Sequence, residues 1–156
     1  RYANLIVTRT LAKAYGLASL RVGYGVASAE LSGLLNRVRQ PFNVNSLALI
    51  AAEAAITDEA FVQQTRALND AGMTQWLVAT QALGLRCLPS RGNFLCVDMG
   101  TEAMPIFQAL LGEGVIVRPV GAYGLPNHLR ISIGTEEENS FAINALARVL
   151  KQQVAG

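Results

Sequence analysis

Short runs typical of β-strands alternate with longer helical segments through the second half of this sequence. The strand-like runs are LRCLPS, NFLCVDMG, VIVRPV and HLRISIGT. The helical segments are DEAFVQQTRALNDAGMTQWLVATQALG before them, TEAMPIFQALLGEG among them and EEENSFAINALARVLKQQ after them. Asp58 is placed to cap the first of these helices, and Gly84 is placed to end it. Strands and helices in this order predict an α/β or α+β layout.

The first third of the chain predicts two strands followed by two helices. The strands are NLIVTRT and LRVGYGVA, and the helices are AELSGLLNRVRQ and SLALIAAEAAIT. The first helix should end before Pro41, because the residue before a proline disfavours the helical conformation. Asn45 or Ser46 should cap the second helix, whose apolar, alanine-rich composition predicts that it is buried. We expect a domain boundary between Pro41 and Thr57.

Charged residues are scarce in this chain. They make up 15% of its 156 residues, against about 25% in an average globular chain, while hydrophobic residues make up 51%. So few charges do not comfortably cover a free-standing surface, so we expect either an extensive interface or a piece of a larger protein. The chain begins at Arg1, without an initiator methionine or a signal-peptide pattern, which favours the second expectation.

Several functional classes are disfavoured by the same composition. No apolar run approaches the roughly 20 residues that a membrane-spanning helix needs, so we expect no membrane partner. The net charge of +2 is small and the arginines are scattered, which argues against nucleic acid as a partner. Cys87 and Cys96 lie in apolar strand-like runs without metal-ligand spacing. They predict buried free thiols in a reducing cytosol, and no metal site.

Lys13 is one of only two lysines, and it stands in the weakly charged stretch TLAKAYGLASLRVGYG. Burial would favour a neutral amine, which is a nucleophile able to form a Schiff base with an aldehyde. Alternatively, the stem covers apolar surface while the ammonium reaches water. Arg21, the Thr10 hydroxyl and the amides around Gly16 offer donors to a phosphate or carboxylate. Together they predict a site for a phosphorylated aldehyde such as pyridoxal phosphate.

Arg118 and Arg130 form a second pair of candidate anion-binding residues. Arg118 follows the apolar run GVIV, and Arg130 alternates with Leu129 and Ile131. In a strand this alternation places Arg130 on the face opposite to its apolar neighbours. Two arginines reached from apolar strands suggest recognition of two anionic groups. The alternatives are a structural ion pair and a solvated strand face.

Four further residues have positions that allow either a functional or a structural role. Asn93, before the strand NFLCV, either binds a polar group of the substrate or makes a turn. Asp98 ends that strand and is expected to cap or turn the chain. The segment GAYGLPN predicts a loop, in which Tyr123 lines a site or seals the loop. We expect His128, the lone histidine, in a loop as a packed or solvent-facing residue rather than a catalytic base.

The stretch TRTLAKAYGLASLRVGYG closely resembles the lysine segment of pyridoxal-phosphate-dependent aminotransferases of fold type I, class I/II. The stretches NVNSLALIAA, GNFLCVD, GVIVRP and HLRISIGTEEEN resemble the histidinol-phosphate aminotransferase branch of that family. The matches run in order along nearly the whole chain. The resemblance implies an α/β fold with the end of the large cofactor-binding domain in residues 1–45. An interdomain helix and a small α+β C-terminal domain would follow in residues 46–156, and the N-terminal half of the enzyme would be absent.

The resemblance also implies roles for five of the candidate residues. Lys13 would form the Schiff base with pyridoxal 5'-phosphate and move the proton between substrate carbon and cofactor. Arg21 and Thr10 match positions that bind the cofactor phosphate. Arg130 matches the arginine that holds the carboxylate of the amino-acid or keto-acid substrate, and Arg118 matches an arginine at the substrate's phosphate end.

The implied reaction moves an amino group between histidinol phosphate and 2-oxoglutarate in histidine biosynthesis, in a cytoplasmic homodimer. The alternatives are a phosphothreonine decarboxylase or an aminotransferase for aromatic or other amino acids, both of the same fold. A further alternative is a non-catalytic anion-binding or dimerisation remnant. Ala12 departs from the family, where serine commonly precedes the lysine. We expect that the 156-residue chain alone cannot catalyse efficiently.

Overall fold

The structure, a computed structural model, describes residues 2–154 of the chain and the side chains of residues 2–152. The chain divides into two compact units, an N-terminal unit of residues 1–66 and a C-terminal unit of residues 67–156. Each unit has its own cluster of buried apolar side chains. The prediction that domains of the whole protein divide at residues 1–45 and 46–156 concerns a longer chain and stays a prediction.

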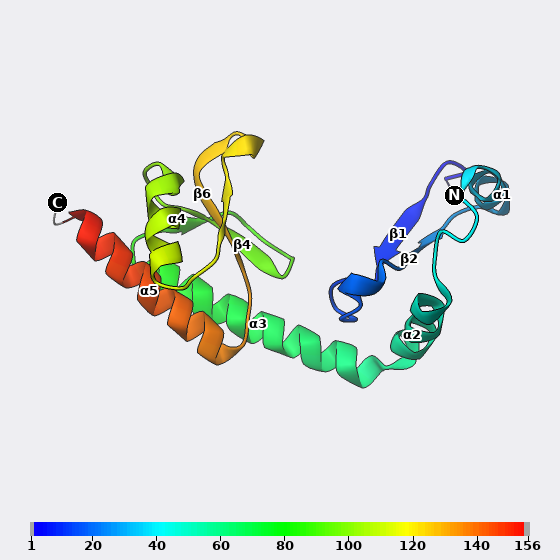
Figure 1. The fold of residues 1–156 in the computed structure, drawn as a ribbon, viewed down its shortest axis with the longest axis horizontal. Coiled ribbons are helices and arrows are strands. Elements are labelled where there is room, and N and C mark those ends of the chain that lie inside the picture. Colours follow the sequence, from blue (N-terminus) through cyan, green and yellow to red (C-terminus); the bar gives the residue numbers. More distant parts are fainter. Residues whose placement is uncertain (1, 155–156) are drawn as a thin grey trace. The chain divides into compact units, whose positions relative to one another are not determined.

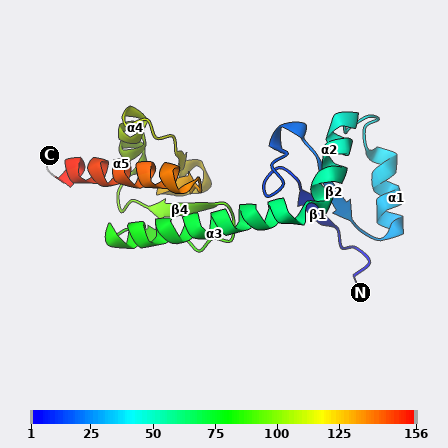
Figure 2. The same cartoon turned by 90° about the horizontal axis from the view of Figure 1, so that it is seen from below.

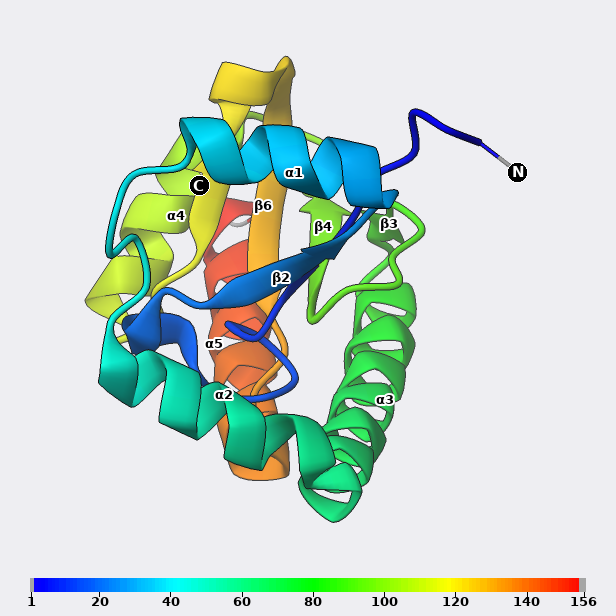
Figure 3. The ribbon, with the colours of Figure 1, turned by 90° about the vertical axis from the view of Figure 1, so that its right-hand side faces the viewer.

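The N-terminal unit pairs two short strands and follows them with two helices. Its elements are β1 (Val7–Thr10), the 3-10 turn η1 (Ala18–Leu20), β2 (Gly23–Val26), α1 (Ala29–Val38) and α2 (Ser46–Thr57). β1 and β2 are antiparallel, with Thr10 opposite Gly23, and β2 leads into α1 (Figure 3). The Asn45 side chain accepts a hydrogen bond of 2.8 Å from the amide of Ala48, which confirms Asn45 as the N-cap of α2.

Most of the apolar surface of the N-terminal unit is exposed. Its buried cluster consists of Leu11, Val22, Ala48 and Ala52. On α2, Leu47 is 71% exposed and Ile50 is 66% exposed, so the prediction of a buried helix is wrong for these residues. The two-stranded pair and its loop cover only one stripe of the helix, because they are too small to surround it. The scarcity of charge in the sequence therefore corresponds to a broad apolar surface.

The C-terminal unit combines a four-stranded antiparallel sheet with three helices. Its elements are the C-terminal part of α3 (Glu59–Ala82), β3 (Arg86–Cys87), β4 (Phe94–Asp98), α4 (Ala103–Gly112), β5 (Arg118–Val120), the 3-10 turn η2 (Gly121–Tyr123), β6 (Leu125–Ser132) and α5 (Glu136–Val154). The strand order is β3-β4-β6-β5. The two central strands, β4 and β6, are labelled in Figure 1. α3 begins at the predicted cap, where the Asp58 carboxylate accepts from the amide of Phe61, and Gly84, just after it, has a φ of +72°.

One face of this sheet packs on helices. Leu95 and Val97 of β4 and Leu129 of β6 are fully buried, in one cluster with side chains of α3, α4 and α5. The cluster includes Trp76 of α3, which is fully buried. α4 and α5 lie side by side in both views (Figures 1 and 2). The period of two along the strands therefore separates a buried face from a face that carries the polar residues.

The expected α/β architecture is confirmed, and one predicted loop is wrong. The segment GAYGLPN contributes the turn η2, and its last three residues start β6. His128 consequently lies inside a strand, directly opposite Asp98 of β4, and not in a loop. β6 pairs with β4 only from His128 to Ser132, so Pro126, which lacks an N–H, lies outside that ladder.

Cys87 and Cys96 are free thiols, as predicted, although each is half-buried rather than fully buried. No described helix has the length and apolar composition that crossing a membrane requires. Within residues 2–154, histidine, cysteine, aspartate and glutamate side chains do not gather in groups of three or more that could hold a metal ion.

Candidate functional site

Thr10 and Arg21 both line a cavity of about 280 Å³ in the N-terminal unit. The lining residues are Thr8, Arg9, Thr10, Ala12, Arg21, Val22 and Gly23. Two arginines and two hydroxyls are therefore present, and the lining contains no carboxylate. A cavity with this set of donors suits an anion such as a phosphate.

Close pairing of β1 and β2 forms the base of this cavity. The amide of Leu11 donates to the carbonyl of Val22 at 3.2 Å, and both of these side chains are buried. A Cβ built on Gly23 would lie only 2.5 Å from the backbone oxygen of Arg9. Position 23 therefore requires glycine, because any side chain would push the two strands apart.

The donors of the cavity are left largely uncommitted. Thr10 Oγ1 accepts a hydrogen bond of 3.0 Å from the amide of Ala12, so its own proton remains available to an anion. Arg21 has a φ of +53°, and its Nη1 donates to the carbonyl of Ala18 at 3.0 Å. No carboxylate within residues 2–152 forms an ion pair with Arg21. Its guanidinium therefore keeps both its charge and most of its N–H groups for a ligand.

Lys13 lies in the loop that joins β1 to β2, but it is not among the residues that line the cavity. Its carbonyl accepts from the amide of Gly16 at 2.9 Å, which closes a tight turn. The lysine side chain is exposed, so the expectation of a lysine withdrawn from water is wrong for this chain. The loop buries the side chain of Leu11 and leaves that of Lys13 exposed.

In the C-terminal unit, Arg130 and Arg118 lie directly opposite each other on β6 and β5. Leu129 and Ile131, which flank Arg130, are buried in the core, which confirms that Arg130 faces the other side of the sheet. Cys96 occupies the same row on β4, on the other side of Arg130. Like charges in directly opposed cross-strand positions repel each other, so this row creates a strongly positive place on the sheet.

Aromatic rings hold both of these guanidinium groups. Arg130 Cζ lies 5.1 Å from the ring centroid of Phe94, and its buried Nε has no hydrogen-bond partner. Arg118 Nη2 donates to the Tyr123 hydroxyl at 3.2 Å, and Arg118 Cζ lies 5.8 Å from the centroid of that ring. Neither arginine forms an ion pair with a carboxylate in the described part of the chain. The structural ion pair weighed from the sequence is thereby excluded there.

Asn93 lies at the start of β4, immediately before Phe94. Its backbone carbonyl accepts from the amide of Ile133 at 2.9 Å, which extends the pairing of β4 with β6 by one residue. The Asn93 side chain is exposed, and the turn before it is closed by Ser90, whose Oγ donates to the Phe94 carbonyl at 2.6 Å. Asn93 is thus close in the chain to the Phe94 ring that contacts Arg130.

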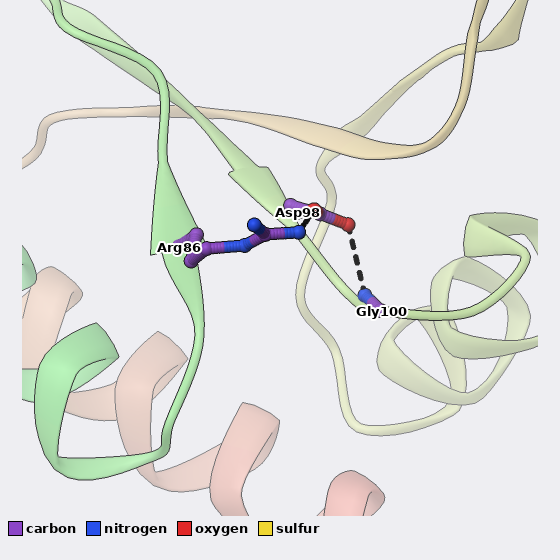
Figure 4. Close-up of polar contacts among 3 residues, drawn as sticks. All are labelled: Arg86, Asp98 and Gly100. Atoms are coloured by element: carbon purple, nitrogen blue, oxygen red, sulfur yellow. Dashed lines mark hydrogen bonds and ion pairs between the residues drawn. The ribbon is translucent and has the colours of Figure 1, made fainter.

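Asp98 ends β4 and turns the chain, as predicted. Figure 4 shows its carboxylate between the amide of Gly100, which donates at 2.9 Å, and the guanidinium of Arg86, at 3.0 Å. The hydrogen bond from Gly100 is the main reason that the pKa of Asp98 is lowered, and Arg86 and the opposite His128 act in the same direction. Burial opposes this lowering. These contacts hold the Asp98 side chain as a carboxylate, which in turn fixes the chain at the end of β4.

Sequence reasoning missed Phe94, Tyr123 and Arg86 as partners of charged residues. Phe94 could have been placed on the face of Arg130 from the period of two, once the register of β4 with β6 was known. The register depends on residues more than thirty positions apart, and the sequence contains no local signal for it. The contact of Tyr123 with Arg118 depends on the turn η2, which the sequence predicted only as an unstructured loop.

Comparison with known proteins places the chain among enzymes. The family described as "Aminotransferase class I and II" matches residues 1–146. Histidinol-phosphate aminotransferase 2 of Pseudomonas fluorescens strain Pf0-1 is 59% identical over 149 residues, which cover 96% of this chain and 40% of that protein. The chain thus spans about 40% of the length of the curated relatives it matches.

Solved structures resemble the chain in fold. The histidinol-phosphate aminotransferase of Sinorhizobium meliloti, in complex with pyridoxal-5'-phosphate, has a TM-score of 0.89 and 28% identity. The similarity covers 97% of this chain and 42% of that one. The L-threonine-O-3-phosphate decarboxylase of Porphyromonas gingivalis has a TM-score of 0.82 and 25% identity, covering 96% of this chain and 47% of that one. The same arrangement of elements therefore occurs in enzymes of two activities.

Proposed function

The chain belongs to the class I and II aminotransferases, and from this we propose that the whole protein moves an amino group between histidinol phosphate and 2-oxoglutarate. The reaction would be a step of histidine biosynthesis and would require pyridoxal 5'-phosphate. The observation that carries the proposal is that Arg118 and Arg130 lie directly opposite each other. No carboxylate of the described residues forms an ion pair with either of them. Both proposed substrates bring a phosphate or carboxylate groups to such a pair.

The residues of the N-terminal unit fit the phosphate end of this cofactor. The cavity beside β1 and β2 offers the Thr10 hydroxyl and the Arg21 guanidinium. Its lining residues include no aspartate or glutamate, whose charge would repel a phosphate. We propose that these two residues hold the cofactor phosphate. Lys13, whose side chain is exposed in this chain, would bind the aldehyde carbon covalently through Nζ. When bound, the cofactor supplies an acceptor for the electron pair released at the substrate carbon.

The chain's own residues would then divide the work of positioning and proton transfer. Lys13 Nζ would take the proton from the substrate carbon that carries the amino group, and would return it later. Arg130 would orient the carboxylate of the keto-acid or amino-acid substrate, and Arg118 would hold its other anionic end. Asn93, directly before β4, has an exposed side chain and would bind a polar group of the substrate.

The proposal applies to a protein longer than this chain. The relatives it matches are about two and a half times as long, since 149 residues make up 40% of the first of them. We propose that residues 1–45 complete a larger cofactor-binding domain, and that the whole protein is a cytoplasmic homodimer. The exposed apolar side chains of α2, Leu47 and Ile50 among them, support burial of this helix in the whole protein. The 156-residue chain alone is expected to lack efficient activity.

A second candidate is a decarboxylase of a phosphorylated amino acid. The fold similarity to the threonine-phosphate decarboxylase at a TM-score of 0.82 favours it, because its substrate also carries a phosphate and a carboxylate. The discriminating test is a substrate panel for the whole protein that contains histidinol phosphate, phosphothreonine and phenylalanine. We expect amino transfer from histidinol phosphate to 2-oxoglutarate. Release of carbon dioxide from phosphothreonine would instead support the decarboxylase.

The covalent role of Lys13 has its own test. The whole protein is mixed with pyridoxal 5'-phosphate and reduced with borohydride, and the modified peptide is identified by mass spectrometry. We expect a pyridoxyl group on Lys13, and none in a Lys13→Ala variant. Lys151 near the end of α5 is the internal control, because it is the other lysine of this chain. Modification of Lys151 alone, or no modification, would contradict the proposal and favour an anion-binding or dimerisation module.

A further inference from the structure

We propose that Phe94 is a positioning residue for Arg130. Its ring would hold the Arg130 guanidinium through a cation–π contact, so that the N–H groups stay oriented and unneutralised for an anionic group of the substrate. This inference rests on the proposed function, because it assigns Arg130 to a carboxylate-bearing substrate. It adds a residue of β4 that touches the arginine and not the substrate.

The register of the sheet brings the two side chains together. Phe94 of β4 lies opposite Ser132 of β6, and Arg130 lies two residues before Ser132 on the same face. Diagonal neighbours of this kind are within reach of long and aromatic side chains. Arg130 Cζ is 5.1 Å from the Phe94 ring centroid, which is within the range of a cation–π contact. Backbone pairing therefore places the two side chains within reach of each other.

The Phe94 ring is itself held by the turn that precedes β4. Ser90 Oγ donates to the Phe94 carbonyl at 2.6 Å and accepts from the amide of Gly92 at 3.2 Å. A Cβ built on Gly92 would lie 3.4 Å from the edge of the ring, so the turn packs closely against it. The neighbouring carbonyl of Asn93 is fixed by its bond to Ile133. Because the turn limits the movement of the Phe94 ring, the ring can in turn limit the orientations of the Arg130 guanidinium.

The ring performs a task that a carboxylate could not. A carboxylate beside Arg130 would accept its N–H groups and cancel its charge, and would then compete with an anionic substrate. An aromatic face attracts the cation but leaves the in-plane N–H groups free. Among the described residues no acid pairs with Arg130, and its buried Nε has no acceptor. Within the described chain, the Phe94 ring thus attracts the Arg130 guanidinium without neutralising its charge.

Arg118 has the same kind of partner, which shows that the arrangement is not confined to one position. The Tyr123 ring centroid lies 5.8 Å from Arg118 Cζ, and the Tyr123 hydroxyl accepts from Nη2. Two opposed arginines are therefore each restrained by an aromatic residue. A guanidinium that is already oriented loses less side-chain entropy when it binds an anion, which increases the affinity of the site.

The test compares Phe94→Leu with Phe94→Tyr in the whole protein. The probe is 2-oxoglutarate, and its Kd is measured by calorimetry together with KM and kcat. For Phe94→Leu we expect Kd and KM to rise about five- to tenfold, as the loss of a partly desolvated cation–π contact predicts, with kcat nearly unchanged. Phe94→Tyr keeps the aromatic ring, so its Kd and KM should stay near the wild-type values.

Phe141→Leu is the matched control, because Phe141 is an exposed phenylalanine on α5. It should leave Kd, KM and kcat at the wild-type values. Phe94→Met replaces Phe94→Leu if the latter fails to fold. Wild-type affinity in the Leu or Met variant, or equal losses in the Leu and Tyr variants, would overturn the inference.

The outcome for Phe94 is separable from that of the proposed function. If the wild-type protein binds 2-oxoglutarate but transfers no amino group, the proposed reaction fails, while a selective loss of affinity in Phe94→Leu still supports the inference. If the wild-type protein transfers amino groups and Phe94→Leu behaves like it, the reaction stands and the inference fails. Absence of 2-oxoglutarate binding by the wild-type protein would overturn both.

Discussion

Arg118 and Arg130 lie directly opposite each other on adjacent antiparallel strands, and no carboxylate of the described residues pairs with either. Such a pair is unfavourable for folding, because like charges in opposed positions repel. Structural stability therefore does not explain it, which supports the proposed binding of an anion.

Replacement of Arg118 by glutamine should separate stability from function. Arg118→Gln removes the repulsion between Arg118 and Arg130 at a position that is exposed. The free energy of unfolding should therefore stay within about 0.5 kcal/mol of wild type or rise. The KM for the phosphorylated substrate should rise at least about tenfold, since a charge-assisted contact is lost. Urea unfolding and steady-state kinetics measure the two effects. Arg148→Gln, which breaks an ion pair with Glu113, is the control and should leave KM unchanged.

Asn139 should be a main contributor to the stability of the C-terminal unit. Its buried side chain accepts from Trp76 Nε1 at 2.9 Å and from the amide of Gly134 at 3.0 Å, and donates to the Gly134 carbonyl. Asn139→Leu leaves the buried Trp76 Nε1 and the partly buried backbone groups of Gly134 without partners, and should lower the free energy of unfolding by about 2–4 kcal/mol. Asn144→Leu, at an exposed position of the same helix, should change it by less than about 0.5 kcal/mol. Equal effects would contradict the assignment.

Glycine at position 23 should be required for the strand pair beside the anion cavity. Gly23→Ala places a methyl group 2.5 Å from the backbone oxygen of Arg9, so we expect a loss of about 1–3 kcal/mol in stability. Affinity for inorganic phosphate, measured by calorimetry, should fall with it. Gly33→Ala in α1 is the matched control, because nothing lies within 4 Å of its added Cβ. That change should stabilise the protein by about 0.5–1 kcal/mol. Wild-type stability of Gly23→Ala would contradict the close approach.

The stability of the protein should depend on Asp98 in a defined pH range. Because the folded pKa of Asp98 lies below its ordinary value of 3.8, its contribution is fully present above that value. The contribution is lost as the pH falls through the lowered folded pKa. Asp98→Asn should therefore be less stable than wild type at neutral pH, and the difference should shrink in acid below 3.8.

Chemical denaturation at a series of pH values measures this difference. Arg86→Gln separates the causes, because the hydrogen bond from Gly100, which lowers the pKa of Asp98 most, remains in this variant. It should retain most of the pH dependence of the wild type. A pH dependence abolished by Arg86→Gln would show that the ion pair, and not the backbone, dominates.

Local patterns in the sequence were enough to predict most elements of the fold and the face of Arg130. Helix caps such as Asn45 and Asp58 act within three residues, so the sequence shows them directly. The alternation of Leu129 and Ile131 with Arg130 required only that the segment be a strand. The exposure of Lys13 could not be predicted, because it depends on what else packs against its loop.

Long-range pairing accounts for the remaining differences. The strand that contains His128 forms because β6 pairs with β4, whose residues lie about thirty positions earlier. The row of Cys96, Arg130 and Arg118 depends on the same pairing and on β5, which joins with an irregularity between Pro119 and Val120. None of these registers leaves a local trace in the sequence.

The sheet of the C-terminal unit packs its helices on one face only, and this has an evolutionary consequence. Along β4 and β6, every second residue supports the core, while the residues between them, Arg130 among them, carry the groups for which we propose contact with ligands. Mutations at the latter positions can alter the chemical groups on that face of the sheet without loosening the packing beneath. A lineage can therefore acquire a new chemistry on this scaffold by small steps, each of which leaves a folded protein for selection to act on.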